Sequence, residues 1–421
     1  AVELVDQTML ELASKIPLFN EKLKRFVKGK PGSLLIVEFA GEELNILKNK
    51  LKELDNLMRD LGFNDAVVEA LDPGFQKEIW NVRKSGLNIM MSMKGDGKPV
   101  SCIEDCAVEL KDLAEYTSRL NDLFSKYQTT GTWYAHASVG CLHVRPVLNL
   151  KQEMDAKKLR AITEETFEIV REYKGSHSGE HGDGLLRSEF HEVMFGKRIV
   201  NAFKDIKKIF DPNDLLNPGK IVNPSKIDDR SLFRYNFDYR ESNILEGLDW
   251  SEWGGLDRAV EMCNNNGACR KFNSGVMCPS YRVTQEEKHL TRGRANILRL
   301  ALSGQLGQNA FTSKEMYETM QLCVGCKACR RECPTGVDMN RMKTEFLYHY
   351  NKEHGITFRE KMFSYFPRYA QILTKFGKII NLRDAIPIFS IISEKIFGIS
   401  SKRKLPRWDE NPFSAKEASL S

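Results

Sequence analysis

Four cysteines within eleven residues constrain the fold of this chain more than any other feature. Cys323, Cys326, Cys329 and Cys333 are followed by Pro334, which gives the spacing C-x2-C-x2-C-x3-C-P. In this arrangement three thiolates hold one iron–sulfur cluster and the fourth serves a second cluster. Structural zinc sites usually pair two separate C-x2-4-C hooks instead. The spacing therefore predicts loops wrapped around an iron–sulfur cluster, with a zinc-based interaction module as a rival.

A second, incomplete cysteine group precedes the first. Cys263, Cys269 and Cys278-Pro279 nearly repeat the motif, and Asn266 stands where its second cysteine would be. If the two halves exchange their last cysteines, one complete set of four ligands results: Cys278, Cys323, Cys326 and Cys329. Three thiols are then left over: Cys263, Cys269 and Cys333. These three could hold a three-iron cluster, a four-iron cluster with one other ligand, or no cluster, and we favour a single complete cluster.

Length and charge set the broad class of the protein. At 421 residues, two or more domains are expected. The net charge of +6 is spread along the chain, so nothing indicates nucleic-acid binding, while a mildly positive surface favours anionic substrates. Seven of the ten cysteines fall between positions 263 and 333, which is ligand spacing and not a disulfide framework. We therefore expect a reducing, cytoplasmic compartment.

The longest apolar stretch runs over residues 385–400 and is interrupted by Glu394 and Lys395. It is too short and too charged to span a bilayer, so we interpret it as a buried helix. The basic residues that follow it, Lys402, Arg403 and Lys404, are compatible with peripheral contact at the inner membrane face.

The pattern of strands and helices changes along the chain. Residues 1–224 alternate strand-like runs (33–39, 131–150) with helical stretches (42–61, 155–173), which predicts an α+β domain. Apolar residues at helical spacing in 2–12 predict an opening amphipathic helix, already under way at Ala1, so we expect that something preceded it. Three segments follow: a polar and aromatic linker at 225–253, an α-helical cysteine-rich domain at 254–354, and a helical tail at 355–421 that is a candidate start of a further domain.

Two histidines mark a predicted hairpin. In Gly131–Leu148, Val139 and Gly140 as loop residues would place His136 directly opposite His143. Opposed side chains share a face with their β-carbons about 5 Å apart, which suits two imidazoles binding one divalent ion. Packed or surface histidines are the alternative, and a longer loop is compatible with the unfavourable Val139.

A carboxylate and an imidazole stand side by side in the glycine-rich stretch Ser178-Gly-Glu180-His181-Gly182-Asp183-Gly184. Its glycines, Gly182 among them, would let backbone approach a flat cofactor closely. Glu180 could complete a three-ligand ion site with the two histidines, and His181 could act as a base. An exposed glycine turn with two polar residues is the alternative.

Together, His136-x6-His143, Glu180-His-Gly-Asp-Gly and the run Phe210-Asp-Pro-Asn-Asp-Leu-Leu-Asn217-Pro-Gly-Lys220 resemble the C-terminal half of FAD-linked oxidases, close to D-lactate and D-2-hydroxyglutarate dehydrogenases. Cys278-Pro-Ser-Tyr, Thr291-Arg-Gly-Arg-Ala295 and the second cysteine group resemble bacterial fusions of such enzymes with a 4Fe-4S module. The resemblance covers residues 1–350. It implies an α+β FAD-linked oxidase C-terminal domain, the substrate or cap domain, followed by an α-helical ferredoxin-like iron–sulfur domain.

The resemblance also implies roles for residues. It makes His136, His143 and Glu180 ligands of a divalent metal, commonly zinc, and His181 the base that takes the hydroxyl proton of an anionic 2-hydroxy acid while FAD takes hydride. Arg83 matches an arginine that binds the substrate carboxylate, with a plain surface arginine as the alternative. Asn217 matches a position that closes over the flavin, with a domain-terminal turn as the alternative. One departure is the turn 138–141, Ser-Val-Gly-Cys in place of the family's Asp-Gly-Asn type.

No phosphate-cradling glycine motif occurs in the chain, so the main flavin-binding domain is expected on a longer parent chain or a separate subunit, with its complete loss as the alternative. Electrons are expected to leave through the cluster near Cys323 to a quinone, an electron-transfer flavoprotein or another acceptor. The rival function is a non-catalytic iron–sulfur electron-transfer subunit that retains the oxidase half as a vestige.

Overall fold

The computed structural model describes residues 1–273 and 275–409, which divide into two compact units, Ala1–Phe346 and Leu347–Ser421. Residues 410–421, the end of the predicted 355–421 tail, lie outside the described residues. In the first half of the chain the strands are β1 (Val2–Asp6), β2 (Ser33–Val37), β3 (Lys98–Pro99), β4 (Cys106–Ala107), β5 (Gly131–His136) and β6 (Cys141–Leu148). Its helices are α1 (Gln7–Ser14), α2 (Pro17–Phe26), α3 (Leu44–Asp60), α4 (Pro73–Lys84), α5 (Gly86–Met90), α6 (Leu113–Lys126), α7 (Glu153–Glu172), α8 (Gly184–Arg187) and α9 (His191–Phe210).

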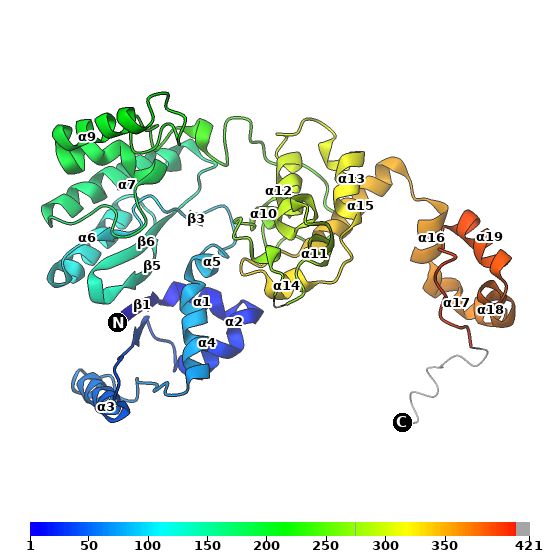
Figure 1. Ribbon diagram of the computed structural model, residues 1–421, viewed down its shortest axis with the longest axis horizontal. Helices are drawn as coiled ribbons and strands as arrows, with labels where there is room; N and C mark the ends of the chain where they lie inside the picture. The colour runs from blue at the N-terminus through cyan, green and yellow to red at the C-terminus, as the bar shows by residue number, and fades with distance from the viewer. Residues whose placement is uncertain (274, 410–421) are drawn as a thin grey trace. The chain divides into compact units, whose positions relative to one another are not determined.

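The strands form one antiparallel sheet in the order β2-β1-β5-β6-β3, with β4 also paired to β6 (Figure 1). Tyr134 pairs with His143, and His136 pairs with Cys141. The predicted direct opposition of His136 and His143 is therefore wrong, because the loop takes four residues: the turn η2 (Ala137–Val139) and Gly140. The shift is an even number of residues, so both histidines still point to the same face of the sheet.

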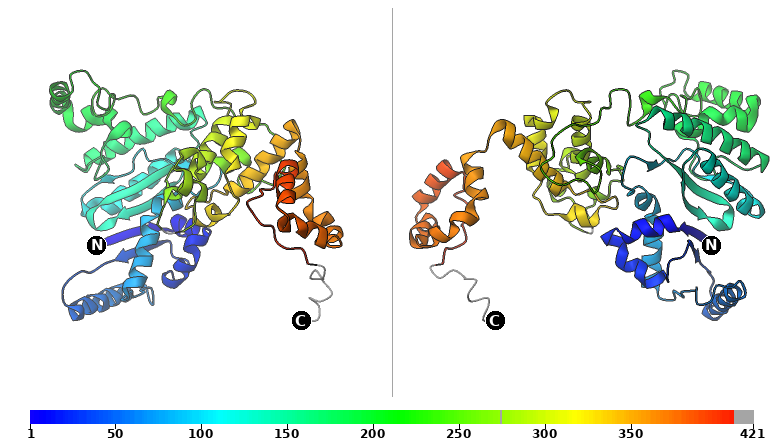
Figure 2. Two further views of the ribbon diagram at one scale, coloured as in Figure 1. Left: turned by 45° about the vertical axis from the view of Figure 1, so that its right-hand side comes forward. Right: turned by 180° about the vertical axis from the view of Figure 1, so that it is seen from behind.

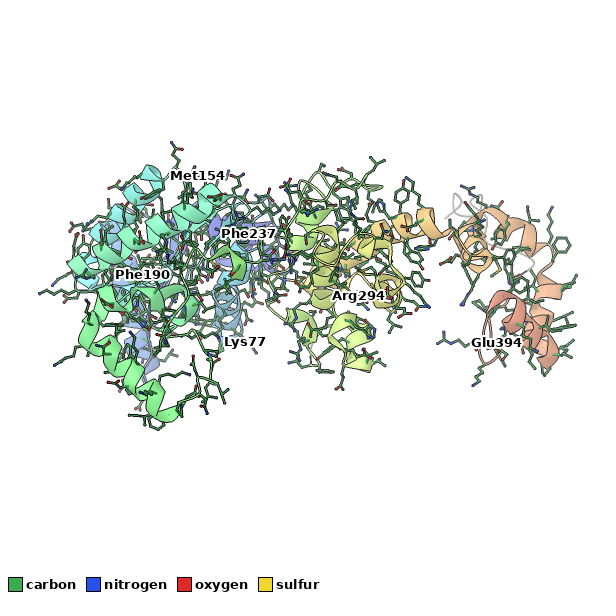
Figure 3. All side chains as sticks on the ribbon, turned by 90° about the horizontal axis from the view of Figure 1, so that it is seen from above. Lys77, Met154, Phe190, Phe237, Arg294 and Glu394 are labelled. Carbon is green, nitrogen blue, oxygen red and sulfur yellow. The ribbon has the colours of Figure 1, made fainter. Side chains whose placement is uncertain are left out.

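Each face of the sheet carries its own hydrophobic core. On one face, α6 and α7 pack on β5 and β6 around Leu120, Phe167 and Val144 (Figure 1). Phe190, labelled in Figure 3, belongs to this core. On the other face, α1, α2, α4 and α5 pack on Tyr134. His136 and His143 follow the alternation of Tyr134, so they lie on this second face.

The opening of the chain is a strand where a helix was predicted. Residues 2–6 form β1, which pairs with β2 and β5, and the helix begins only at Gln7. Alternate burial along β1 shows a strand with one buried face. Asp6 then caps α1, since its side chain accepts a hydrogen bond of 2.7 Å from the Met9 N–H. The apolar residues fit a helical spacing, but the sheet supplies the partners for a strand.

The cysteine-rich segment is helical, with its cysteines in the connecting loops. Its helices are α10 (Leu256–Glu261), α11 (Pro279–Thr284), α12 (Thr291–Leu302), α13 (Lys314–Gln321), α14 (Ala328–Glu332) and α15 (Met339–His354). A buried carboxylate ties this segment to the preceding loop: Glu345 of α15 accepts hydrogen bonds from the N–H groups of Gly247 and Leu248 and from the Trp250 ring. Trp250 is almost fully buried.

The second unit consists of short helices, α16 (Phe358–Ser364), α17 (Phe366–Thr374), α18 (Gly377–Ala385) and α19 (Pro387–Phe397), drawn orange to red in Figure 2. The prediction that 385–400 forms a buried helix is wrong in its burial. Ser393 is the buried residue of α19, whereas Ile388 and Ile396 are about 60% exposed. Among the described residues, no helix combines the length and apolarity needed to cross a membrane.

Candidate active site and cluster site

Three imidazoles converge on one carboxylate oxygen. Glu180 Oε1 lies 3.1 Å from His143 Nε2, 3.2 Å from His136 Nε2 and 3.3 Å from His181 Nε2. The histidines of β5 and β6 are diagonal neighbours with ring centroids 4.9 Å apart. The structure thus brings together the four residues that the sequence singled out from two separate motifs.

The loop that carries Glu180 and His181 is held by Asp105, which sequence reasoning missed. Asp105 is fully buried, and its carboxylate accepts hydrogen bonds from the N–H of Glu180 (2.9 Å), the N–H of His181 (2.8 Å) and the hydroxyl of Ser178 (2.9 Å). Burial opposes ionisation of Asp105, but these bonds outweigh it and lower its pKa. Gly179 permits the approach, because a β-carbon there would lie 3.2 Å from the Asp105 carbonyl oxygen.

Two further carboxylates stand behind the histidines. Glu3 of β1 contacts His136 Nδ1 at 2.8 Å, and Glu104 lies 3.6 Å from His143 Nδ1. Both contacts leave the Nε2 atoms directed at Glu180. A carboxylate behind a ligating imidazole fixes the ring orientation and tautomer at metal sites. No local sequence signal marks these two residues, because their partners are 133 and 39 positions away along the chain.

Arg83 lies in the same cluster but already has a partner. Its side chain is buried, pairs with Glu3 at 2.5 Å and stacks on Tyr134 at 5.0 Å. Tyr134 stacks on His143 (4.8 Å), which stacks on His181 (5.0 Å). A column of four side chains therefore leads from α4 to the glycine-rich loop. The surface alternative for Arg83 is wrong, while its contact with a substrate carboxylate stays a prediction.

The donor set fits a divalent metal. Ligand atoms of His136, His143 and Glu180 all lie within 4.8 Å of one another. Two imidazoles and a carboxylate are a usual zinc set, with metal–ligand distances of about 2.0–2.2 Å. Burial, together with the neighbouring rings of His136 and His181, lowers the pKa of His143 to about 4, so its nitrogen is free to ligate at neutral pH. The residues present therefore fit such an ion.

The remaining predicted residues lie at the surface of this half. Gly182 is exposed with φ 80°, and a β-carbon there would meet no atom within 4 Å. Backbone at this position is exposed. Asn217 is exposed in the segment that follows α9, also with positive φ (52°). Their roles in flavin binding stay predictions.

The cysteine loops enclose a cavity. Its lining includes all four cysteines of the predicted complete set: Cys278, Cys323, Cys326 and Cys329. Cys278 lies 45 residues before Cys323 in the sequence but lines the same cavity as Cys323, Cys326 and Cys329. The predicted exchange, in which each motif supplies its last cysteine to the other, requires this arrangement. Cys329 and Cys278 are buried, whereas Cys326 is exposed. Thiolates on one concave surface fit an iron–sulfur cluster.

Two cations contact the cysteines of this cavity. Arg294, labelled in Figure 3, is fully buried on α12 and lies 3.7 Å from the Cys278 sulfur, while it donates to the carbonyls of His289 (2.7 Å) and Thr319 (3.0 Å). Lys343 donates to the Cys323 carbonyl oxygen at 2.6 Å. The sequence marked Arg294 only as part of a resembling motif. Its position supplies positive charge beside a cluster that would be anionic.

The three leftover thiols form a second group. Cys263, Cys269 and Cys333 are all buried. Burial raises the pKa values of Cys263 and Cys269, and nearby Cys333 raises both further. Asn266 does not complete the set: its side chain binds Asn264 and the Ala268 N–H in its own turn.

Family models match both the α+β segment and the cysteine-rich segment of the chain. Residues 1–221 match the family model described as FAD linked oxidases, C-terminal domain, and residues 259–337 match the model described as 4Fe-4S dicluster domain. These matches confirm the predicted fold class and order of domains. They support FAD and an iron–sulfur cluster as cofactors.

Relatives with curated names extend the match over nearly the whole chain. D-2-hydroxyglutarate dehydrogenase of Escherichia coli is 26% identical over 95% of this chain and 43% of that protein. The enzyme of the same name from Pseudomonas putida is 28% identical over 86% and 39%. D-lactate dehydrogenase of Anaerostipes hadrus is 26% identical over 44% and 38%. The chain thus spans less than half the length of these relatives.

Proposed function

The chain belongs to the family of FAD linked oxidases through their C-terminal domain, and from that premise we propose that it is the substrate-side and electron-exit part of an FAD- and iron–sulfur-dependent D-2-hydroxy acid dehydrogenase. The observation that carries the proposal is the convergence of His136, His143 and His181 on Glu180. D-2-hydroxyglutarate and D-lactate are the substrate types suggested by the names of the relatives. Both are small anionic 2-hydroxy acids.

The site residues have separate tasks in this proposal. His136, His143 and Glu180 hold a divalent ion, of zinc type, which supplies positive charge beside the substrate hydroxyl. His181 is exposed beside them and accepts the hydroxyl proton on its ring nitrogen. Glu3 and Glu104 orient the two ligating imidazoles from behind.

A flavin bound beside this site would supply the hydride acceptor for the carbon that bears the hydroxyl, and the oxidation would leave a 2-oxo acid. Gly182 and Asn217 are the residues of this chain that we assign to its contact. We propose that the flavin-binding domain, on a longer parent chain or a separate subunit, docks beside α9. The exposed apolar side chains there support this: Ile209 is 74% exposed and Phe210 is 82% exposed. Large exposed apolar patches mark interaction sites.

Cys278, Cys323, Cys326 and Cys329 would ligate a 4Fe-4S cluster, which would supply the one-electron steps by which electrons leave the flavin. The shared cavity and the buried cation Arg294 support this assignment. A quinone or an electron-transfer flavoprotein would serve as acceptor. Iron analysis separates one cluster from two: about four irons per chain indicates the complete set alone, and more indicates that the leftover thiols also ligate.

The first test is substrate binding by the zinc-loaded chain. Calorimetric titration with D-2-hydroxyglutarate should show binding that Glu180→Gln and zinc removal abolish, while the L enantiomer binds more weakly. His289→Asn is the matched control, because His289 is a buried histidine outside the site, bonded to Thr284 at 2.8 Å. Equal affinity in Glu180→Gln and the unsubstituted chain would contradict the ligand assignment.

The second test is the anaerobic absorption spectrum with FAD, recorded before and after the hydroxy acid. Bleaching of the flavin bands followed by reduction of the cluster supports the dehydrogenase, and His181→Asn should slow the bleaching while leaving binding intact. Flavin retained by the chain but unchanged by the bound hydroxy acid would favour the rival, an electron-transfer subunit.

A further inference from the structure

A second set of histidine and carboxylate ligands adjoins the glycine-rich loop. Ligand atoms of His177, Asp183 and His191 all lie within 4.8 Å of one another. His177 Nε2 is 3.4 Å from Asp183 Oδ1, and His191 Nε2 is 2.9 Å from Asp183 Oδ2. Atoms that ligate one ion at about 2.0–2.2 Å stand roughly 3–3.5 Å apart. The spacing therefore fits a single bound ion.

Five polar atoms of this set are buried and make no hydrogen bond within the described part of the chain, and the two Nε2 atoms have only the ion-pair contacts with Asp183 given above. Both rings are 1% exposed. Across the described residues, none of the four ring nitrogens of His177 and His191 has a hydrogen-bond partner, and neither does Asp183 Oδ1. Buried polar groups are nearly always satisfied, so five such atoms in one cluster require an explanation. An ion held by both Nε2 atoms and the carboxylate would satisfy three of them.

The surroundings immobilise the two rings. Phe167 packs edge-on against His177 with centroids 5.3 Å apart, and Phe203 packs against His191 at 5.7 Å. Burial lowers the pKa of His177 to about 4, so its ring carries a free lone pair at neutral pH. Aromatic side chains around the two imidazoles leave Asp183, 21% exposed at its side chain, as the solvent side of the set.

The nearby charges do not exclude a cation. Asp183 and Asp105 act on His177 as negative charges, and Arg187 acts as a positive one. Arg187 is itself engaged with backbone carbonyls, at 2.9 Å for that of Gly182. The two carboxylates, Asp183 and Asp105, outnumber the one guanidinium, Arg187, so the local charge favours binding of a divalent cation.

We propose that His177, Asp183 and His191 bind a second divalent ion, of zinc type, that anchors the loop bearing Glu180 and His181. Two imidazoles and one carboxylate are ligands that suit zinc, and three protein ligands leave one position for water. Asp183 lies three residues beyond Glu180. The ion at His136, His143 and Glu180 would therefore hold the loop at one point, and the ion at His177, Asp183 and His191 would hold it at another. This role is structural and does not depend on the proposed dehydrogenase function.

The test is the zinc content of the cluster-containing chain after dialysis against zinc, by mass spectrometry, with iron measured in the same sample to account for cysteines that lack a cluster. We expect about two zinc ions per chain, about one in His191→Gln and Asp183→Asn, and about two in Phe203→Leu. Phe203→Leu is the matched control, since it loosens the same packing without removing a ligand. Asp183→Asn keeps the shape of the side chain at a partly exposed position. It therefore tests the site even if His191→Gln does not fold.

The companion variant His136→Gln separates this site from the Glu180 site. Zinc that survives His136→Gln but is lost in Asp183→Asn establishes the second site even if the first takes no metal. The proposal is overturned if Asp183→Asn and His191→Gln both keep the full zinc content of the unsubstituted chain, or if that chain binds one zinc that His136→Gln removes.

Discussion

Glu3→Gln tests whether the carboxylate behind His136 acts on both metal affinity and stability. Glu3 contacts His136 Nδ1 at 2.8 Å with one oxygen and pairs with buried Arg83 through the other, and its side chain is 10% exposed. Removing one partner of a buried ion pair costs about 3–5 kcal/mol, because a charge is left without compensation. The amide oxygen of glutamine can still accept from Arg83, so we expect the low end, about 3 kcal/mol.

The effect on the metal is separate. Loss of the carboxylate behind a ligating histidine typically costs about 10–100-fold in metal affinity, or about 1.4–2.7 kcal/mol. Zinc affinity should be measured by competition with a chromophoric chelator, and stability by urea unfolding of the zinc-free chain.

The double variant Glu3→Gln/Arg83→Met distinguishes the two effects. Methionine removes the buried charge that glutamine leaves unpaired, so we expect stability to recover while zinc binding stays weak. Wild-type zinc affinity in Glu3→Gln would refute the orienting role of Glu3. Failure of the double variant to regain stability would refute the unpaired-charge argument.

Three further predictions follow from contacts elsewhere. Arg294→Gln removes a buried positive charge 3.7 Å from a ligand sulfur, so the cluster's reduction potential, measured by EPR-monitored titration, should become more negative; an unchanged potential would contradict the assignment. Burial lowers the pKa of Lys98 to about 8, so between pH 8 and its unfolded value the unfolded state binds more protons and this group's contribution to stability rises with pH. Lys98→Met should therefore stabilise the chain more at pH 7 than at pH 10 by urea midpoint, and equal gains would rule out this linkage. Gly140→Ala should lower the free energy of unfolding by well over 1 kcal/mol, because its β-carbon would lie 2.0 Å from a backbone oxygen. Gly182→Ala, with similar φ and open space around it, should cost only about 1 kcal/mol. Equal costs for the two variants would show that the clash at Gly140 is relieved.

The cysteine group at 323–333 and the fold class were recognisable because their signals are local. In this group, two or three residues separate successive cysteines, a spacing typical of thiolates that hold iron–sulfur clusters. The alternation of strands and helices likewise depends on neighbouring residues, and β2, α3 and α7 begin and end within two residues of the predicted ranges. The sequence by itself also singled out His136, His143, Glu180 and His181 as one set.

Only the tertiary structure decided the register, the opening strand and the carboxylates behind the histidines. The turn after His136 is longer than assumed because Gly140 meets the Val108 backbone, which is remote in sequence. Residues 2–6 form a strand because they pair with β2 and β5, and the local sequence of this segment does not reveal those partners. Glu3, Glu104 and Asp105 look like ordinary acidic residues until the fold buries them against rings and N–H groups. Burial and long-range hydrogen bonding determine the free energy of such groups, and the neighbouring sequence reveals neither of them.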